Sequence, residues 1–377
     1  MIIIPAARST TVAITYEGTD ISEDLAPYLS SFTFTDNAKD KADDLTLTLQ
    51  DARGEWLRDW TPSKSDTIKA SIIKQDSHGA QSLPCGTFTV DQCDYSLPPH
   101  TLSIKAVSAT VKGKAATAKR TRHWENATLG SILGQLAGEN NLALMLEGDA
   151  SVKFERLDQT EQTDLEFARQ ICADCGLAVK VQTERLVVYE KEQYEQKSPA
   201  CEIWSDDDRL ISARFTSKTA KVYKKAKLTY HNPMKDTDIT GEYEDDSVEG
   251  SEHELILHER VEDSGAAERI AKQRLLEANR AEITGSITLM GDVRLAAGIT
   301  VQLGGFGMFS GKHFVNKVTH KVDSSGYTTT LELGQPQDEK SDSKQRKAKR
   351  QSAKGKRKTG AKGTGGELFY EGERYYQ

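Results

Sequence analysis

Residues 264–333 decide the fold, and their sequence is SGAAERIAKQRLLEANRAEITGSITLMGDVRLAAGITVQLGGFGMFSGKHFVNKVTHKVDSSGYTTTLEL. At the start of this stretch apolar residues recur at helical spacing, and Ser264 carries a hydroxyl that can cap the helix. From residue 283 onwards apolar and polar residues alternate in short segments, which is typical of antiparallel strands. One helix followed by several strands predicts a small barrel or sandwich that the helix covers as a lid.

A glycine-rich loop interrupts these predicted strands. Its sequence is Gly304-Gly305-Phe306-Gly307-Met308-Phe309-Ser310-Gly311. Neither a Lys-Ser/Thr pair nor a predicted helix follows the glycines, so the loop lacks the pattern of a phosphate-binding loop. Two interpretations remain open: a mobile turn, or a loop that contacts a neighbouring subunit or lines a channel. We take residues 304–309 as candidate interface residues.

The N-terminal third of the sequence also predicts antiparallel strands. Alternating segments recur at residues 11–16, 29–35, 43–51, 67–73, 86–91 and 101–107. The clearest places Leu45, Leu47 and Leu49 on one face. Trp56 and Trp60 lie in a compact connection that we expect to pack over one end of a barrel. A partner interface is the alternative role for these two tryptophans.

The middle of the sequence, residues 124–190, has a different pattern. Thr128 and Thr163 each precede an apolar helical segment as N-cap residues, and Gly176 follows the second segment where a helix ends. Predicted strands follow both helices. A basic stretch with few apolar residues, 112–122, marks a boundary before this part. The predicted fold class is therefore mainly β with an α+β insertion, in domains 1–112, 113–200 and 201–335, the last with a helix at 264–280.

The last predicted segment, residues 336–377, is a flexible basic tail with an aromatic end. Residues 340–362 contain eleven Lys and Arg and one acid, a local charge of +10, and subtracting it from the whole-chain charge of −7 leaves −17. An acidic folded part argues against broad nucleic-acid binding, except through residues 340–362. The aromatic end is either a docking peptide on a tether or a disordered terminus, and its residues include Phe369, Tyr370, Tyr375 and Tyr376.

The sequence contains no pattern from which a catalytic or metal site can be predicted. Cys172 and Cys175 have C-x-x-C spacing, but they lie in a predicted helix without a second pair. His253 and His258 are five residues apart, so they cannot share one helical face as zinc-protease histidines do. The five cysteines are scattered, which does not indicate a disulfide framework. No apolar run approaches the ~20 residues of a membrane span. We predict no enzyme activity, no cofactor and no metal.

The order of these segments resembles the phage late control D family, the baseplate hub proteins of contractile tails, and the hub portion of type VI secretion spike proteins. The likeness extends over roughly residues 1–335. The matching pieces are helix 267–278, Gly285, residues 295–301, Gly307, Gly311, residues 314–320 and residues 327–333. The acidic-Leu-x-Leu-x-Leu run, the tryptophan-containing connection and residues 83–88 continue the resemblance in the N-terminal part.

This resemblance implies a structural role without catalysis. It implies two tube-like β-barrel or sandwich domains that flank the α+β domain. It also implies a homotrimer that adapts a hexameric tail tube to a trimeric spike, in a phage or a tailocin. The implied partners are further copies of the chain, the spike protein and the tail tube or tube-initiator protein, with baseplate wedge and tape-measure proteins as additional partners. The implied location is the virion baseplate, after synthesis in the host cytoplasm. The alternatives are a tail-associated peptidoglycan hydrolase and a nucleic-acid-binding protein acting through the basic tail.

Overall fold

The computed structural model describes residues 9–335, apart from positions 40, 57, 59, 77–78, 109–117, 183–184, 219–221, 233–235, 247, 249–250 and 281. The chain divides into two compact units, residues 1–337 and 338–377, and the described residues all belong to the first. The predicted basic run and the aromatic residues at the end of the sequence lie outside the described residues.

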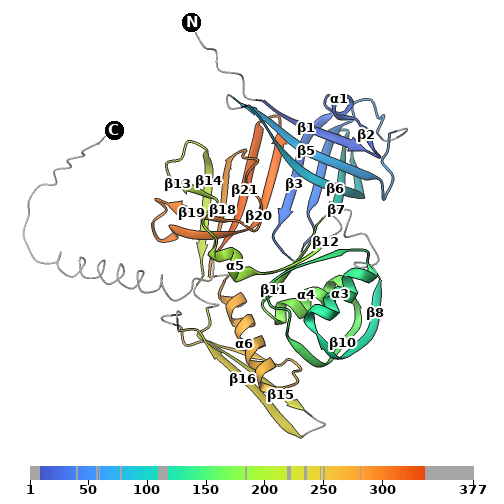
Figure 1. The fold of residues 1–377 in the computed structure, drawn as a ribbon. Coiled ribbons are helices and arrows are strands. Elements are labelled where there is room, and N and C mark those ends of the chain that lie inside the picture. Colours follow the sequence, from blue (N-terminus) through green and yellow to red (C-terminus); the bar gives the residue numbers. More distant parts are fainter. Residues whose placement is uncertain are drawn as a thin grey trace, which may run out of the picture. The chain divides into compact units, whose positions relative to one another are not determined.

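One mainly antiparallel sheet, in which only the pair β13–β19 is parallel among the described strands, contains strands from both ends of the first unit (Figure 1). Its order is β14-β18-β21-β20-β3-β4-β7-β6-β5-β1-β2, with β19 paired to β20 and β13 paired to β19. The N-terminal elements are β1 (Ser9–Tyr16), β2 (Thr19–Asp20), α1 (Ser22–Leu25), β3 (Leu29–Asn37), β4 (Asp44–Gln50), β5 (Thr67–Asp76), β6 (Gly79–Ser96) and β7 (Thr101–Ser108). The C-terminal strands are β13 (Cys201–Trp204), β14 (Leu210–Ser217), β18 (Ile283–Met290), β19 (Thr300–Gly304), β20 (Gly311–Asp323) and β21 (Gly326–Gly334). The prediction of a mainly β fold is confirmed.

The two ends of the chain meet at the pair β3–β20. Seven register pairs join these strands, from Lys317 opposite Asn37 to Asp323 opposite Ser31. In the middle of the seam, His320 is buried opposite Phe34 and stacks on its ring at 6.0 Å between centroids. Alternation along a sequence defines a strand but not its neighbour, so this pairing is not visible in either segment alone.

Each end of the sheet carries its own hydrophobic core. The first core contains Phe32, Leu45, Leu47 and Leu49, so the inward face predicted for residues 43–51 is confirmed. The second core contains Ile287, Val301, Leu303, Val315, Val318 and Leu331. Full burial of such a side chain contributes about 1.5–3 kcal/mol. The two cores therefore supply the main stabilisation of the sheet.

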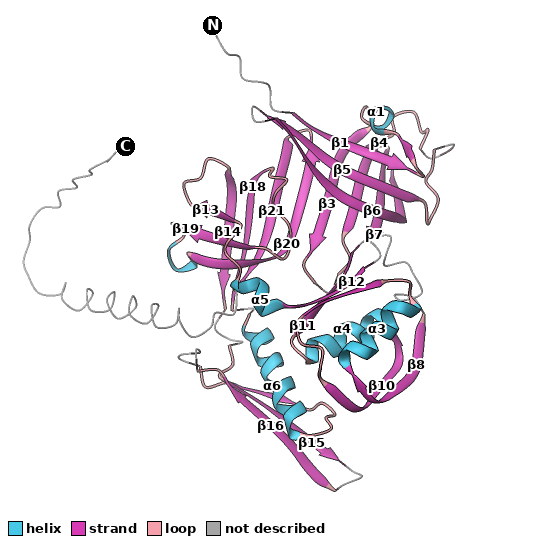
Figure 2. Ribbon diagram, viewed as in Figure 1, coloured by secondary structure: helices cyan, strands magenta, loops and turns pink. Residues whose placement is uncertain are grey.

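The α+β part lies between the two groups of sheet strands in the sequence, and Figure 2 shows two of its helices side by side. Thr128 and Thr163 form the predicted N-caps, each in a capping box, and Gly176 with a φ of +78° follows α4 as predicted. The elements are β8 (Lys119–Thr128), α3 (Leu129–Glu139), β9 (Ala143–Glu147), β10 (Lys153–Thr163), α4 (Asp164–Asp174), β11 (Leu177–Gln182), β12 (Arg185–Glu190) and α5 (Lys191–Gln196).

The sequence did not predict strand β8. It begins at Lys119, inside the stretch 112–122 that we interpreted as a basic boundary. Charged and polar residues dominate this strand, and it pairs with β10, which is equally polar. Because neither strand has the apolar alternation of a half-buried strand, hydrophobic pattern alone could not find this hairpin-like pair.

Helix α6 (Ser264–Asn279) packs on a separate small sheet. That sheet has the order β16-β15-β17 and consists of β15 (Lys225–Asn232), β16 (Thr237–Glu244) and β17 (Glu254–Leu257). Ala267, Ala271 and Leu275 of the helix are fully buried with Leu228 of β15. A Cβ at Gly241 would lie 2.3 Å from the backbone of Ala267, so glycine permits this close approach. The helix thus covers strands that precede it, and the predicted lid over residues 283–333 was wrong.

The start of α6 also differs from the prediction. The N-cap residue is Asp263, whose carboxylate accepts the N–H of Ala266 at 2.7 Å. Ser264, predicted as the cap, is the first helical residue. Asp and Ser are comparable N-cap residues, and two of them in succession cannot be ranked by type alone.

Candidate assembly surfaces

Hydroxyl side chains line one face of the large sheet. One row crosses five strands, from β14 to β3, with each residue opposite the next: Ser212, Thr288, Thr330, Thr319 and Thr35. The hydroxyl oxygens of Thr288 and Thr330 are 3.1 Å apart. Adjacent rows add Ser286, Thr328, Thr33, Thr46, Ser31, Thr48 and Ser103. This hydroxyl face is the one turned away from the two cores, because side chains alternate along each strand.

The charges on the hydroxyl face from β14 to β7 balance once Asp94 of the neighbouring strand β6 is included. Three ion pairs lie on this face: Lys317 with Glu332 across β20 and β21, Lys321 with Asp323 along β20 at 2.6 Å, and Lys105 with Asp94 of β6 at 3.1 Å. Arg214 and Asp44 add one charge of each sign. The sequence predicts an acidic folded part, so the acidic residues in excess lie elsewhere on the unit. A surface without net charge has little attraction for nucleic acid.

The large sheet ends in two strands with almost no charge. Among the described residues, β14 pairs only with β18, and β1 pairs with β5 and, at Thr15 and Tyr16, with β2. Strand β14 has one charged residue, Arg214, and β1 has none. Ile211, beside a register shift in β14, is 54% exposed. Free edges are usually protected by lysine, proline or a covering element, and these two edges lack the first two.

The predicted glycine loop is folded, with its aromatic rings turned inward. It contains the short helix η2 (Gly307–Phe309), and the rings of Phe306 and Phe309 lie 5.3 and 5.0 Å from the ring of Phe215 on β14. Met308 is 67% exposed. Of the six residues 304–309, Met308 therefore presents the large exposed side chain, and its role in an interface stays a prediction.

Trp204, the last residue of β13, is an exposed aromatic residue that was not predicted from the sequence. Its side chain is 52% exposed, although it lies on Gly304, where a Cβ would come within 2.4 Å of the indole ring. The indole N–H donates to a carboxylate oxygen of Glu202 at 3.3 Å. The only signal in the sequence is an isolated tryptophan, because the pairing of β13 with β19 that places the glycine beneath it is long-range.

The other two candidate tryptophans form an aromatic cluster with Tyr28. The ring centroids of Trp56 and Trp60 are 5.4 Å apart, and both rings lie about 6 Å from Tyr28 in edge-on geometry. Trp56 packs against the first core, whereas Trp60 is exposed. A shallow hollow of about 330 Å³ borders the cluster and is lined by Tyr28, Leu29, Val322 and Asp323 among others. A partner role for these tryptophans remains a prediction.

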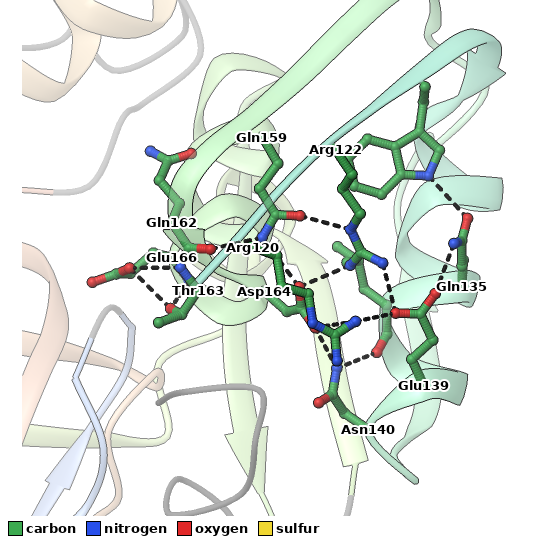
Figure 3. A network of polar contacts seen from close by, with 12 residues as sticks. Arg120, Arg122, Gln135, Glu139, Asn140, Gln159, Gln162, Thr163, Asp164 and Glu166 are labelled. Atoms are coloured by element: carbon green, nitrogen blue, oxygen red, sulfur yellow. Dashed lines mark hydrogen bonds and ion pairs between the residues drawn. The ribbon is translucent and has the colours of Figure 1, made fainter. Parts of the chain in front are cut away.

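A polar network joins four elements of the α+β part (Figure 3). The guanidinium of Arg122 donates to Gln159 at 2.9 Å, to Glu139 at 2.6 Å and to Asp164 at 2.8 Å. Hydrogen bonds from Arg122 hold the pKa of the Glu139 carboxyl at about 2. All carboxylates of this network accept hydrogen bonds from arginine or amide groups. The network therefore holds β8 and β10 against α3 and α4. It offers no available acid or base within its residues.

The C-x-x-C pair, Cys172 and Cys175, lies in and against the hydrophobic core of the α+β part. Both cysteines lie in or directly after α4, and burial raises the pKa of the Cys172 thiol strongly and that of Cys175 to about 11. Protonated thiols are poor nucleophiles and poor metal ligands. His253 and His258 flank strand β17 and not a helix. Across the described parts of the chain, no three His, Cys, Asp or Glu side chains group as metal ligands would, and no helix has the length and apolar character to cross a membrane.

The described unit has the fold of phage tail proteins. The 43 kDa tail protein of prophage MuSo2 from Shewanella oneidensis matches it with a TM-score of 0.69 at 13% identity, over 87% of this chain and 99% of that chain. The tail protein from Neisseria meningitidis MC58 matches with a TM-score of 0.66 at 13% identity, over 87% and 97% of the two chains. The c3393 protein of E. coli, a component of the type VI secretion system, gives 0.52 at 10% identity over 83% and 74%. At these identities the likeness concerns the fold alone.

Sequence similarity then assigns the family. The model of the phage tail baseplate hub (GPD) family matches residues 79–326, and the chain belongs to that family. The probable baseplate hub protein of Escherichia phage 186 is 25% identical over 362 residues, which cover 85% of this chain and 91% of that protein. The probable baseplate hub protein of Escherichia phage P2 is 29% identical over 170 residues, covering 45% and 42%. The resemblance found in the sequence is confirmed, and the chain is a structural protein of the phage tail baseplate.

Proposed function

We propose that the chain builds the baseplate hub as a homotrimeric ring in which the large sheet continues from copy to copy. The observation that carries this proposal is the pair of edge strands without lysine or proline: β14 at one end of the sheet, and β1, beside the two-residue strand β2, at the other. The two edges are different strands, so pairing β14 of one copy with β1 of the next is a heterologous contact. Such contacts close into rings when the rotation between copies allows it. The number three follows from the resemblance to hubs that adapt a trimeric spike to a hexameric tube.

The large sheet allows a trimer to present six similar parts to a hexameric partner. Each copy contributes two blocks of strands to the large sheet, β1 to β7 from one end of the chain and β13, β14 and β18 to β21 from the other, joined at β3–β20. Three copies thus present six blocks around the ring. A hexameric tail tube above and a trimeric spike below are the partners that such a ring fits, with baseplate wedge and tape-measure proteins as further contacts.

The hydroxyl face supplies the lining of the passage in this proposal. Threonine and serine side chains with cancelling charges present neither a field that holds nucleic acid nor an apolar surface that holds an unfolded protein. The mechanism is mechanical and steric: the ring stays closed around material that passes without adhering. No residue needs to perform chemistry for this role.

A pair of isoleucine variants tests the edge contact. Ile211 on β14 is 54% exposed and Ile256 on β17 is 62% exposed, so neither side chain is needed for a core. A lysine on a sheet edge opposes pairing with another strand. We expect Ile211→Lys to convert the trimer to a monomer and Ile256→Lys to leave it intact, as measured by light scattering. A wild-type protein that remains monomeric at micromolar concentration, or an Ile211→Lys variant that stays trimeric, would contradict the proposal.

A further inference from the structure

Two exposed apolar side chains lie at the same end of the β13–β19 pair. Register places Trp204 opposite Gly304, the last residue of β19, and Met308 follows four residues later in η2. The backbone N–H of Ser205 donates to the carbonyl oxygen of Gly304 at 3.0 Å, which ties the two chain segments together. The aromatic rings that flank Met308 hold η2 against β14. We call Trp204 and Met308 the tip pair.

The tryptophan of the tip pair is held in place before any partner arrives. The indole of Trp204 rests on the backbone at Gly304 and donates to Glu202, so its orientation is set although half of its surface is open. An ordered side chain loses little conformational entropy on binding. Tryptophan and methionine are enriched in the buried centres of protein interfaces. A preordered, exposed tryptophan together with an exposed methionine is therefore the type of surface that anchors a folded partner.

Carboxylates dominate the border of the tip pair. The turn after Trp204 contains three aspartates, and the N–H of Asp207 donates to the carbonyl oxygen of Trp204 at 3.1 Å. The charged residues of this border are Glu202, Asp206, Asp207, Asp208, Arg209 and Lys312, with four negative and two positive charges. Arg209 engages Asp207 at 2.7 Å, while Asp206 and Asp208 are exposed. A partner that fits this border carries positive charge around an apolar pocket.

The position of the tip pair sets it apart from the strands that we assign to the ring. Strands β13 and β19 lie off the main strand path, which runs from β14 to β2 (Figure 1). The proposed pairing between copies uses the backbone edges of β14 and β1, whereas the tip pair lies on β13 and on η2, which packs against the side chain of Phe215 on β14. A surface that this pairing does not use is available to a different protein.

From these observations we infer that Trp204 and Met308 dock a second tail protein, one whose surface offers an apolar pocket bordered by lysine and arginine. The inference rests on the membership of the chain in the baseplate hub family, and it does not depend on the trimer. A second copy of the chain is the competing occupant, and the experiment separates the two.

The test measures binding of the full-length protein to each purified tail protein encoded by the same phage, in turn, by calorimetry or interferometry. The variants are Trp204→Ala, Met308→Glu and the double charge reversal Asp206→Lys with Asp208→Lys. The matched control is Met145→Glu, at an exposed methionine on β9. We expect each of the three variants to raise the Kd for one tail protein at least tenfold and the control to change it less than twofold. Added salt should weaken the wild-type complex more than that of the charge-reversed variant.

Light scattering of each variant in the same buffers identifies the occupant. An unchanged mass together with lost binding supports the inference. A variant mass that falls while binding to tail proteins persists would assign the tip pair to contacts between copies and overturn it. Wild-type protein that binds no tail protein, or tip variants that bind as the wild type does, would overturn it as well. A monomeric wild-type protein whose binding depends on the tip pair would count against the ring and not against this inference.

Discussion

Two joints within the described unit are built in opposite ways. At β3–β20, seven backbone register pairs and a buried His320–Phe34 contact unite the two ends of the chain in one sheet. The α+β part meets that sheet through polar groups: the ammonium of Lys180 lies 2.6 Å from Asp36 and 3.5 Å from Asp43. Backbone pairing over a core makes strands unfold together, whereas charged contacts respond to salt and pH and allow parts to separate. The sheet is thus the rigid element, and the α+β part is an attachment to it.

Removing the aromatic side chain of Phe34 from the β3–β20 joint should cause the largest loss of stability. Phe34 is buried between Phe88 and His320, with ring centroids 5.9 and 6.0 Å away. Phe34→Ala leaves a cavity at the joint and should lower the free energy of unfolding by about 3–5 kcal/mol. In hydrogen exchange, protection should fall in β18, β20 and β21 as well as in β4 to β7. Faster exchange confined to the N-terminal strands would show that the joint does not couple the two ends.

Acid should weaken the sheet joint through His320. Burial lowers the pKa of His320 from 6.5 to about 4, so the unfolded chain binds this proton more readily than the folded one. The free energy of unfolding should therefore fall as the pH drops from about 6.5 to 4, by up to about 3 kcal/mol, and change little from this source below pH 4. His320→Gln cannot titrate and should lose this part of the dependence. Its stability relative to the wild type should rise steadily from pH 7 to pH 4 in urea unfolding.

A second group, the largely buried Asp43, also makes the free energy of unfolding depend on pH in this range. The effect of His320 is therefore measured as the difference in stability between the variant and the wild type, and not from the wild-type pH dependence alone. Burial raises the pKa of the Asp43 carboxyl to about 6, and this group stabilises the folded state as the pH falls below that value, with a sign opposite to that of His320. Asp43 is present in both proteins, so its effect cancels in the difference. A difference that stays flat from pH 7 to pH 4 would mean that His320 is not held neutral.

Removing the ammonium group of Lys180 from the polar joint should lower the stability less than Phe34→Ala does, and the effect should be confined to the α+β part. Lys180→Ala leaves Asp36 and Asp43 largely buried without their cation, and it should cost about 2–3 kcal/mol. Exchange should rise in β11 and β12 while β18 to β21 stay protected. Lys227→Ala, which removes a solvent-exposed pair with Glu242, is the control and should leave the unfolding curve nearly unchanged. If hydrogen-exchange protection fell throughout the large sheet in Lys180→Ala, the two joints would not differ as described.

The smallest effect is expected where α6 meets α4. Arg274 lies 2.8 Å from Asp174 and 3.0 Å from Glu259, and its side chain is partly exposed. Arg274→Ala should cost less than about 1 kcal/mol at low salt and nothing measurable at 1 M salt. Urea unfolding at both ionic strengths measures this. A cost that is unchanged by salt would indicate that the arginine contributes through packing of its stem.

Local structure could be predicted from sequence wherever neighbours in the chain determine it. The alternation of Leu45, Leu47 and Leu49 gave a strand and its inner face, and Thr128 and Thr163 marked two helix starts, because these features depend on residues a few positions apart. Which distant segments of the chain pair or pack together could not be predicted. The joining of β3 to β20, the seat of α6 on β15 and β16, and the contact of Trp204 with Gly304 all depend on pairings between distant segments.

The same distinction between local and long-range features applies to the candidate surfaces. The glycine loop was identified by composition, but which of its residues points outward depends on Phe215, far away in the sequence. The hydroxyl face was hidden because its threonines are spread over strands from both ends of the chain. A free edge has no signal of its own in a single sequence, since it is defined by the strand that is not beside it.

Cross-linking between β14 and β1 tests whether the copies form a closed ring through these two edges. One variant carries cysteines at Ser212 on β14 and at Thr11 on β1, and two further variants carry one cysteine each. A short thiol-to-thiol cross-linker is added to each purified protein, with the wild type as the control for its own cysteines. We expect the double variant to form covalent trimers between copies, and we expect neither single variant to give more cross-linked product than the wild-type background. Dimers from the Ser212→Cys variant alone would indicate a two-fold contact between β14 strands and would contradict the ring.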